Sequence, residues 1–143
     1  MGTRRKAREL ALQALYQRDL TGDQFPERFV QDFDAGDAEV NAFCLTLIHG
    51  VSEHREEIDG LIEKACENWR AERISKVDLN LLRLGTYELV GTDVPARIII
   101  NEAIEIAKRF GTLDSSTFVN GVLDAIASKL GRKEGQGTTD ERR

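Results

Sequence analysis

Apolar residues recur every three to four positions along most of this chain, and this period constrains the fold more than any other feature. Such spacing places the apolar side chains on one face of an α-helix. Between residues 38 and 69 the positions that follow it are Val40, Phe43, Cys44, Leu47, Ile48, Val51, Ile58, Leu61, Ile62, Ala65 and Trp69. The stripe lapses at residues 52–57, so the segment predicts two helices with a turn near Ser52–His54. Trp69 is expected to anchor the core.

The first forty residues predict one long helix and one short helix. Residues 4–20 carry a single apolar stripe, with Thr3 as the candidate N-cap and Gly22 after the last turn. Residues 26–33 predict the short helix. Its inward-facing side chains would be Phe25, Phe29, Val30 and Phe33.

The C-terminal half predicts three helices separated by turn-forming residues. Ser75, with Asp78 three residues later, resembles a capping box and opens a helix that ends before Pro95. Asp114 or Ser115 caps the last helix. The three helices span about residues 76–92, 96–110 and 115–130.

These segments predict an all-α fold of six or seven helices joined by short loops. At 143 residues the chain is long enough for one domain with a continuous core, which we place at residues 1–130. Residues 131–143 contain no apolar side chain, so they predict a disordered polar tail.

Charge is distributed unevenly along the chain. Residues 1–18 carry five cations and one anion, a balance of +4. Since the whole chain is −5, the remaining residues carry −9. An anionic body repels a polyphosphate, so any contact with nucleic acid is expected at the basic N-terminal segment.

Several function classes find no support in the sequence. No run approaches the ~20 apolar residues that span a bilayer, and no apolar run follows the N-terminal cations, so we expect a cytoplasmic protein without membrane contact. His49 and His54 have neither zinc nor triad spacing, and phosphate-loop, GxSxG and HExxH motifs are absent. We therefore expect no enzyme, metal or cofactor. Cys44 and Cys66 are expected to be small buried hydrophobic residues.

One face of the first predicted helix combines cations with an aromatic side chain. On a helical wheel Arg5, Arg8, Glu9, Leu12 and Tyr16 fall within about 100° of one another, with Leu12 exposed between two guanidinium groups. Cations hold phosphates and an aromatic ring can stack on an unpaired base, so the face favours single-stranded RNA. Arg4 adds a further phosphate donor. The alternative is a solvated terminus with Tyr16 at the edge of the core.

Two positions in the C-terminal half also draw attention. Arg83 lies in an otherwise apolar helix, so it either pairs internally or reaches a ligand. Gly121 in mid-helix costs about 1 kcal/mol relative to alanine, which a close helix crossing would explain. The alternative for this segment is that Phe118 lies at an exposed helix start and can stack on a base.

Several blocks of the chain resemble, in order, the NusB family of bacterial transcription antitermination factors. They are the arginine-rich residues 4–16, residues 77–89, residues 94–111 and residues 118–124. The resemblance covers about residues 4–130. Residues 21–40 match poorly, and the tail does not match.

The resemblance implies two small helical bundles packed across each other, at about residues 1–70 and 71–130. It also implies a factor that binds the boxA element of ribosomal RNA leader transcripts, a single-stranded RNA, together with NusE, a ribosomal protein. Such a factor supports antitermination by RNA polymerase. The RNA face carried over from the family comprises Arg4, Arg5, Lys6, Arg8, Gln13, Tyr16 and Phe118. A second group, near the RNA or the partner protein, comprises Glu72, Asp78, Arg83 and Asp114.

The chain departs from the family pattern at two positions. Lys6 stands where the family often has arginine, which keeps a phosphate contact but weakens bidentate recognition. Thr117 stands where some relatives have lysine, which removes one phosphate contact. The sequence leaves open whether the protein is a monomer or a homodimer. The alternative function is a helical protein-interaction adaptor without direct RNA binding.

Overall fold

The computed structural model describes residues 2–32, 37–66 and 73–132. Within these ranges the chain forms seven α-helices and no β-strand. They are α1 Thr3–Thr21, α2 Glu27–Asp32, α3 Ala38–Glu53, α4 Arg55–Ala65, α5 Lys76–Gly91, α6 Ala96–Phe110 and α7 Ser115–Lys129. The predicted all-α fold is confirmed, and α3 and α4 meet at His54, inside the predicted turn.

Helix ends follow the turn-forming residues of the sequence. Gly22 ends α1 at φ 77°, a left-handed conformation that glycine adopts without strain. Ser75 caps α5 by accepting a hydrogen bond from the Asp78 N–H at 3.1 Å. The capping box is half complete, since the buried Oδ1 of Asp78 has no hydrogen-bond partner among the described residues. Thr3, the predicted N-cap, is instead the first helical residue.

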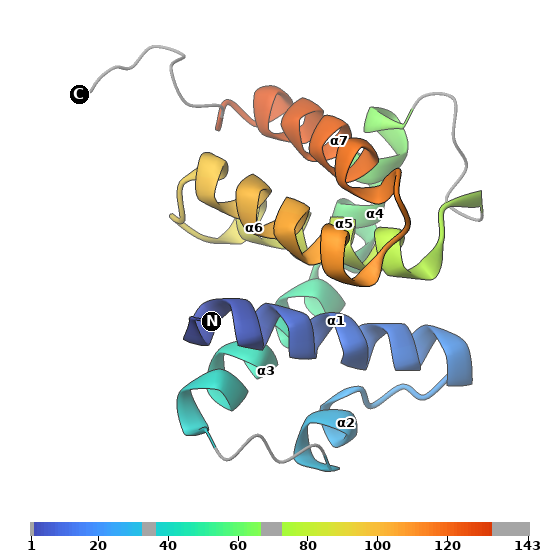
Figure 1. Cartoon of the computed structure of the whole chain (residues 1–143), viewed down its shortest axis with the longest axis vertical. Coiled ribbons are helices and arrows are strands. Elements are labelled where there is room, and N and C mark those ends of the chain that lie inside the picture. Colours follow the sequence, from blue (N-terminus) through green and yellow to red (C-terminus); the bar gives the residue numbers. More distant parts are fainter. Residues whose placement is uncertain (1, 33–36, 67–72, 133–143) are drawn as a thin grey trace.

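The helices form two groups that face each other (Figure 1). α1, α2 and α3 lie on one side, and α4, α6 and α7 lie on the other. The helix α5 joins the groups, because it packs against α1, α3, α4, α6 and α7. α4 packs against α5 and α7 as well as α3. The division of the chain into bundles near residue 70 stays a prediction.

A single apolar cluster fills the space between these helices. Its fully buried side chains include Leu15, Leu47, Leu82, Ile106 and Leu123. Cys44 and Cys66 are buried and free, as predicted. Burial raises the pKa of the Cys44 thiol to about 12, so this thiol stays protonated and unreactive at neutral pH. No described helix is both long and apolar enough to cross a membrane.

Two expectations about which side chains face inward are wrong. Phe25 was expected in the core but is 54% exposed, because it lies in the loop before α2. Leu12 was expected at the surface but is buried, because its side of α1 faces other helices. Trp69 and residue 33 lie outside the described residues.

The chain just beyond α7 is held against the preceding helices. The Arg132 guanidinium donates hydrogen bonds to the backbone carbonyl oxygens of Leu89, Thr92 and Val94. These bonds satisfy carbonyl groups around the C-terminal end of α5, which would otherwise lack a donor. Residues 133–143 lie outside the described part of the chain, so the disordered tail stays a prediction.

Candidate nucleic-acid interface

Arg8, a predicted phosphate ligand, is instead buried between helices. Its guanidinium forms two hydrogen bonds of 2.8 Å with the two carboxylate oxygens of Glu88 on α5. Both side chains are less than a tenth exposed. Because its donors are directed inward, Arg8 links α1 to α5 and cannot hold a phosphate at the surface without breaking this pair.

Arg5 forms a similar link between α1 and α6. Its Nε and NH2 groups donate to the carboxylate of Glu102 at 2.9 Å and 2.7 Å. The Arg5 side chain is about one third exposed, whereas that of Arg8 is buried. Arg5 therefore lies at the edge of the α1–α6 contact, where it aligns the two helices.

A third ion pair crosses the same contact with the opposite polarity. Glu9 on α1 accepts hydrogen bonds of 3.0 Å and 3.3 Å from Arg109 on α6. Glu9 is buried, but more than half of the Arg109 side chain is exposed. The Arg109 guanidinium also lies 5.2 Å from the ring centroid of Phe110. It therefore keeps donors toward solvent beside an aromatic ring.

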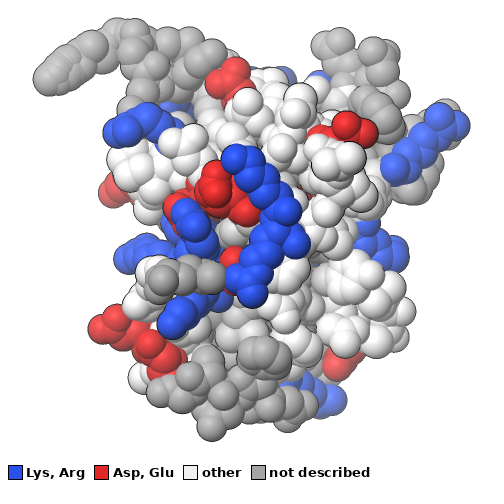
Figure 2. All heavy atoms as spheres, viewed as in Figure 1, with Lys and Arg blue, Asp and Glu red and all other residues white. Residues whose placement is uncertain are grey.

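Four exposed cations lie where α1 meets α6. Arg4 and Lys6 on α1 are exposed, as are Lys108 and Arg109 on α6. Figure 2 shows lysine and arginine side chains over this contact, with acidic atoms between them, while the surface toward the C-terminal end of α1 is mostly uncharged. The Arg4 guanidinium lies over the ring of Phe43, 4.2 Å from its centroid, which fixes its position through a cation–π contact.

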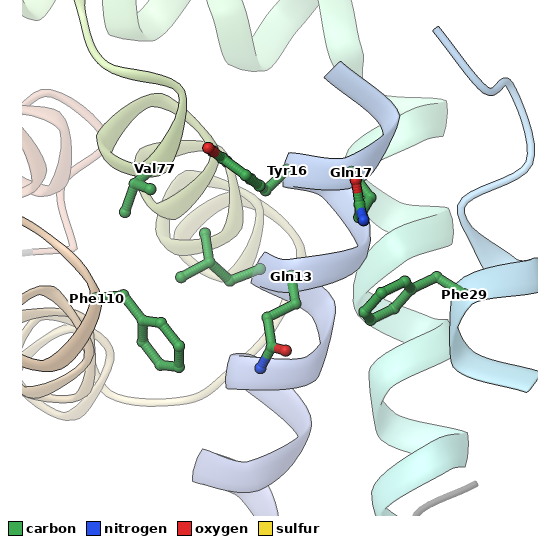
Figure 3. A pocket seen from close by; sticks show the side chains of 7 residues that line it. Gln13, Tyr16, Gln17, Phe29, Val77 and Phe110 are labelled. Carbon is green, nitrogen blue, oxygen red and sulfur yellow. The ribbon is translucent and has the colours of Figure 1, made fainter. Parts of the chain in front are cut away.

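An apolar hollow of about 210 Å³, which we call the aromatic pocket, lies beside these cations. Three helices and the first turn of α5 contribute to it. Its lining residues are Leu12, Gln13, Tyr16, Gln17, Phe29, Val77 and Phe110. In Figure 3 the rings of Phe29 and Phe110 lie on opposite sides of α1, with the Gln13 side chain between them.

A wider groove of about 650 Å³ lies at the N-terminal end of α1. Arg4, Arg5 and Arg8 line one side of it, and Ile98 and Glu102 of α6 line the other. Its arginines leave it positively charged overall, but two of the three are already paired with glutamates. This groove therefore offers Arg4 as its exposed donor for an anion.

Arg83 pairs internally, which is one of the two roles predicted for it. Its guanidinium donates to both carboxylate oxygens of Asp59 at 2.9 Å and 3.2 Å and to Asp19 at 3.0 Å. Burial raises the pKa of Asp19, but a hydrogen bond from Asn80 and the charge of Arg83 outweigh it, so the pKa is lowered overall. Arg83 therefore ties α5 to α1 and α4 and does not face a ligand.

The other predicted residues of the C-terminal half are spread around α5 and α7. Phe118 is half-buried and packs against the core. Asp114 is exposed just before α7, and Asp78 lies next to Val77 of the aromatic pocket. Glu72 lies outside the described residues. Among the described residues, no group of three histidine, cysteine or carboxylate side chains is placed to hold a metal ion.

Sequence reasoning missed the contribution of α6 and α2 to this surface. Arg109 and Phe110 lie at the C-terminal end of α6, a segment for which only the apolar stripe was interpreted. Phe29 of α2 was expected to face only inward. The sequence did carry a signal, since Lys108, Arg109 and Phe110 place two cations beside an aromatic residue. Their position beside Gln13 depends on the ion pairs that hold α6 next to α1, which no local pattern shows.

The Arg5–Glu102 pair should make the free energy of unfolding depend on pH. Hydrogen bonds from Arg5 lower the pKa of Glu102, although burial acts in the opposite sense. Such a carboxyl contributes stability that is present above its ordinary pKa of ~4.3 and is lost as the pH falls through the lowered value. We expect Glu102→Gln to flatten the plot of urea-unfolding free energy against pH below about 5.

Glu63→Gln, on the distant helix α4, is the matched control for the loss of one exposed carboxylate. If Glu102→Gln left the acid limb of the plot as steep as in the parent, the pair would contribute no pH-dependent stability.

Comparison with known proteins gives consistent matches over nearly the whole chain. The family model described as the NusB family matches residues 5–128. Among curated relatives, the transcription antitermination protein NusB of Geobacter sulfurreducens is 49% identical over 134 residues, covering 91% of this chain and 97% of that protein. The NusB of Anaeromyxobacter dehalogenans is 47% identical over 130 residues, covering 89% and 92%.

Solved structures agree with these matches. NusB of T. maritima has a TM-score of 0.82 and 40% identity, over 88% of this chain and 91% of that one. A chain from a structure of antitermination factors NusB and NusE in complex with double-stranded RNA has a TM-score of 0.79 and 30% identity. That match covers 90% of this chain and 98% of the other.

Proposed function

The chain belongs to the NusB family of transcription antitermination proteins, and on that basis we propose that it binds RNA through the surface where α1 meets α6. The observation that carries this proposal is the group of exposed cations, Arg4, Lys6, Lys108 and Arg109, next to the aromatic pocket. Guanidinium and ammonium groups bind phosphates, and the neighbouring rings can stack on unpaired bases.

The arginines paired with glutamates have a different role in this proposal. Arg8 and Arg5 hold α1 against α5 and α6, so they position the exposed cations and do not contact the RNA themselves. In this proposal Lys6 and Arg109 make the phosphate contacts that the sequence predicted for Arg5 and Arg8. We also assign Gln13 and Tyr16 to the RNA contact, and their position in the lining of the aromatic pocket supports this.

We propose boxA of ribosomal RNA leader transcripts as the target, bound in the cytoplasm together with a NusE-type ribosomal protein. A related chain was solved with NusE and double-stranded RNA, which supports both kinds of partner. The role is non-catalytic: the complex would act by joining the antitermination assembly of RNA polymerase. The uneven charge of the chain favours separate surfaces for the two partners. RNA would bind the cationic surface, and the anionic remainder leaves other faces for the protein partner.

Neutralising two exposed cations tests the proposed interface. We expect Lys6→Gln with Arg109→Gln to weaken binding of a boxA RNA by at least about tenfold, because two charge-assisted hydrogen bonds to phosphate are lost. The slope of log affinity against log salt should fall by about 0.7 for each lost contact with single-stranded RNA. Gel-shift titration at two salt concentrations, with and without NusE, measures both quantities.

The matched control removes the same charge from other faces of the molecule. Lys64→Gln with Lys129→Gln alters exposed lysines on α4 and α7. Equal loss of affinity in both double variants would mean that net charge, and not this surface, governs binding. A duplex of the same sequence, titrated in parallel, shows whether the surface prefers unpaired RNA.

A further inference from the structure

The chain turns back on itself at Gly131, immediately after α7. The Gly131 N–H donates to the Ser128 carbonyl oxygen at 3.1 Å. The Arg132 N–H donates to the Ala127 carbonyl oxygen at 2.8 Å. These two bonds, with Gly131 at a φ of 71°, form a Schellman motif, and this left-handed conformation favours glycine. The turn returns the Arg132 side chain to the helices that precede α7.

The Arg132 guanidinium bridges the connection between α5 and α6. It donates to the carbonyl oxygen of Leu89 within α5, to that of Thr92 at 3.1 Å, and to that of Val94, two residues before α6. Figure 1 shows the end of α7 on the same side of the molecule as this connection. The donors of a guanidinium lie in one rigid plane, so the carbonyl groups bound to it keep fixed positions relative to one another. Arg132 therefore fixes the path of residues 92–95 from α5 into α6.

The same connection contributes to the groove at the N-terminal end of α1. Val94 and Ile98 line this groove together with Arg4, its exposed cation. Within the connection, the Val94 N–H donates to the Thr92 hydroxyl at 3.3 Å. This bond joins two residues of the connection itself, so it does not tie the connection to the end of α7. Arg132 supplies that tie from outside.

We propose that Arg132 is a positioning residue for RNA binding, because it fixes the α5–α6 connection and with it a wall of the groove that contains Arg4. This inference rests on the proposed function. It adds a residue that acts through the backbone of the connection and not through contact with the RNA. A strand that enters the groove would meet a wall that is already ordered, so less freedom is lost on binding.

Removal of the guanidinium tests whether it fixes the connection. Arg132→Met keeps an unbranched side chain but removes every donor. In the full-length variant, the amides of Ile98 and Ile99 in the first turn of α6 should exchange with solvent about 10-fold faster, because the hydrogen bonds that hold the connection are lost. Amides of α3 should exchange as in the parent, since the opening is local.

RNA affinity tests whether the connection matters for binding. Arg132→Met should weaken binding of boxA RNA about 3- to 10-fold in a gel-shift titration, because the groove is less ordered before binding. The slope of log affinity against log salt should stay as in the parent, since no phosphate contact is lost. A fall of about 0.7 in the slope would show that Arg132 itself contacts a phosphate, which overturns the positioning role.

Matched variants separate geometry from charge and from general stability. Lys129→Met removes an exposed cation from the same end of α7 and should change neither measurement. Gly131→Ala keeps the guanidinium but strains the turn, so it should reproduce both effects of Arg132→Met. Gly60→Ala in α4 is its control, because an added methyl group there meets no atom within 4 Å.

The outcomes separate this inference from the proposed function. Parent-like exchange at Ile98 and Ile99 in Arg132→Met overturns the inference, as does equal acceleration in α3, which would show a general loss of stability. If the Lys6/Arg109 double variant loses RNA binding while Arg132→Met binds like the parent, the RNA interface stands and the positioning role falls. A parent protein that binds no RNA, with or without NusE, overturns both.

Discussion

Arg8→Ala is expected to lower the free energy of unfolding by about 3–5 kcal/mol, because it leaves a buried carboxylate without its partner. The Glu88 side chain is 2% exposed, and both of its oxygens accept hydrogen bonds from Arg8. Removal of the guanidinium forces this carboxylate either to stay charged in an apolar site or to take up a proton. Urea denaturation monitored by circular dichroism measures the loss.

Two further variants show whether the unpaired charge is the cause. Arg8→Met with Glu88→Leu removes both charges and keeps the volume, so it should be close to the parent or more stable. Arg5→Ala should cost only about 0–1 kcal/mol, since the Arg5 side chain is one third exposed and its pair is screened by water. If Arg8→Ala were no worse than Arg5→Ala, the buried pair would not stabilise the fold.

Sequence reasoning succeeded in predicting the helices themselves. The helix bounds could be predicted because they depend on local signals: apolar spacing, and residues such as Gly22 and Ser75 that end or cap a helix. The all-helical class followed from the same signals. These features need no knowledge of which helices are neighbours.

The orientation of α1 could not be predicted in the same way. A helical wheel shows that Arg8 and Leu12 share a face, but it does not show what that face meets. Here it meets α5 and α6, where Glu88 and Glu102 neutralise the arginines. A cationic cluster in sequence therefore became a set of interhelical ion pairs in the structure.

For the same reason, the sequence pointed to the part of the candidate site that lies on α1 and not to the part that lies on α6. Gln13 and Tyr16, which the resemblance assigns to the RNA face, both belong to α1 and line the pocket. Phe110 and Arg109 complete the surface from a helix about 100 residues away in sequence, and side-chain ion pairs such as Arg109 with Glu9 bring that helix to α1.

Leu82→Ala should lower the free energy of unfolding by about 3–5 kcal/mol, since it opens a cavity in the helix that joins the two groups. Leu82 is fully buried in α5, which packs against α1 and α3 on one side and α4, α6 and α7 on the other. Leu113→Ala makes the same chemical change at a side chain that is 99% exposed, and it should stay within about 0.5 kcal/mol of the parent.

The position of α5 further predicts that Leu82→Ala destabilises both groups of helices together. A helix shared by two groups couples them, so the variant should still unfold in one transition with an unchanged urea slope. Amide hydrogen exchange should accelerate by the same factor in α3 and α7, because both are protected by the same global opening. Faster exchange confined to α7 would show that the groups unfold independently, and the core would then have to be regarded as two cores that meet at α5.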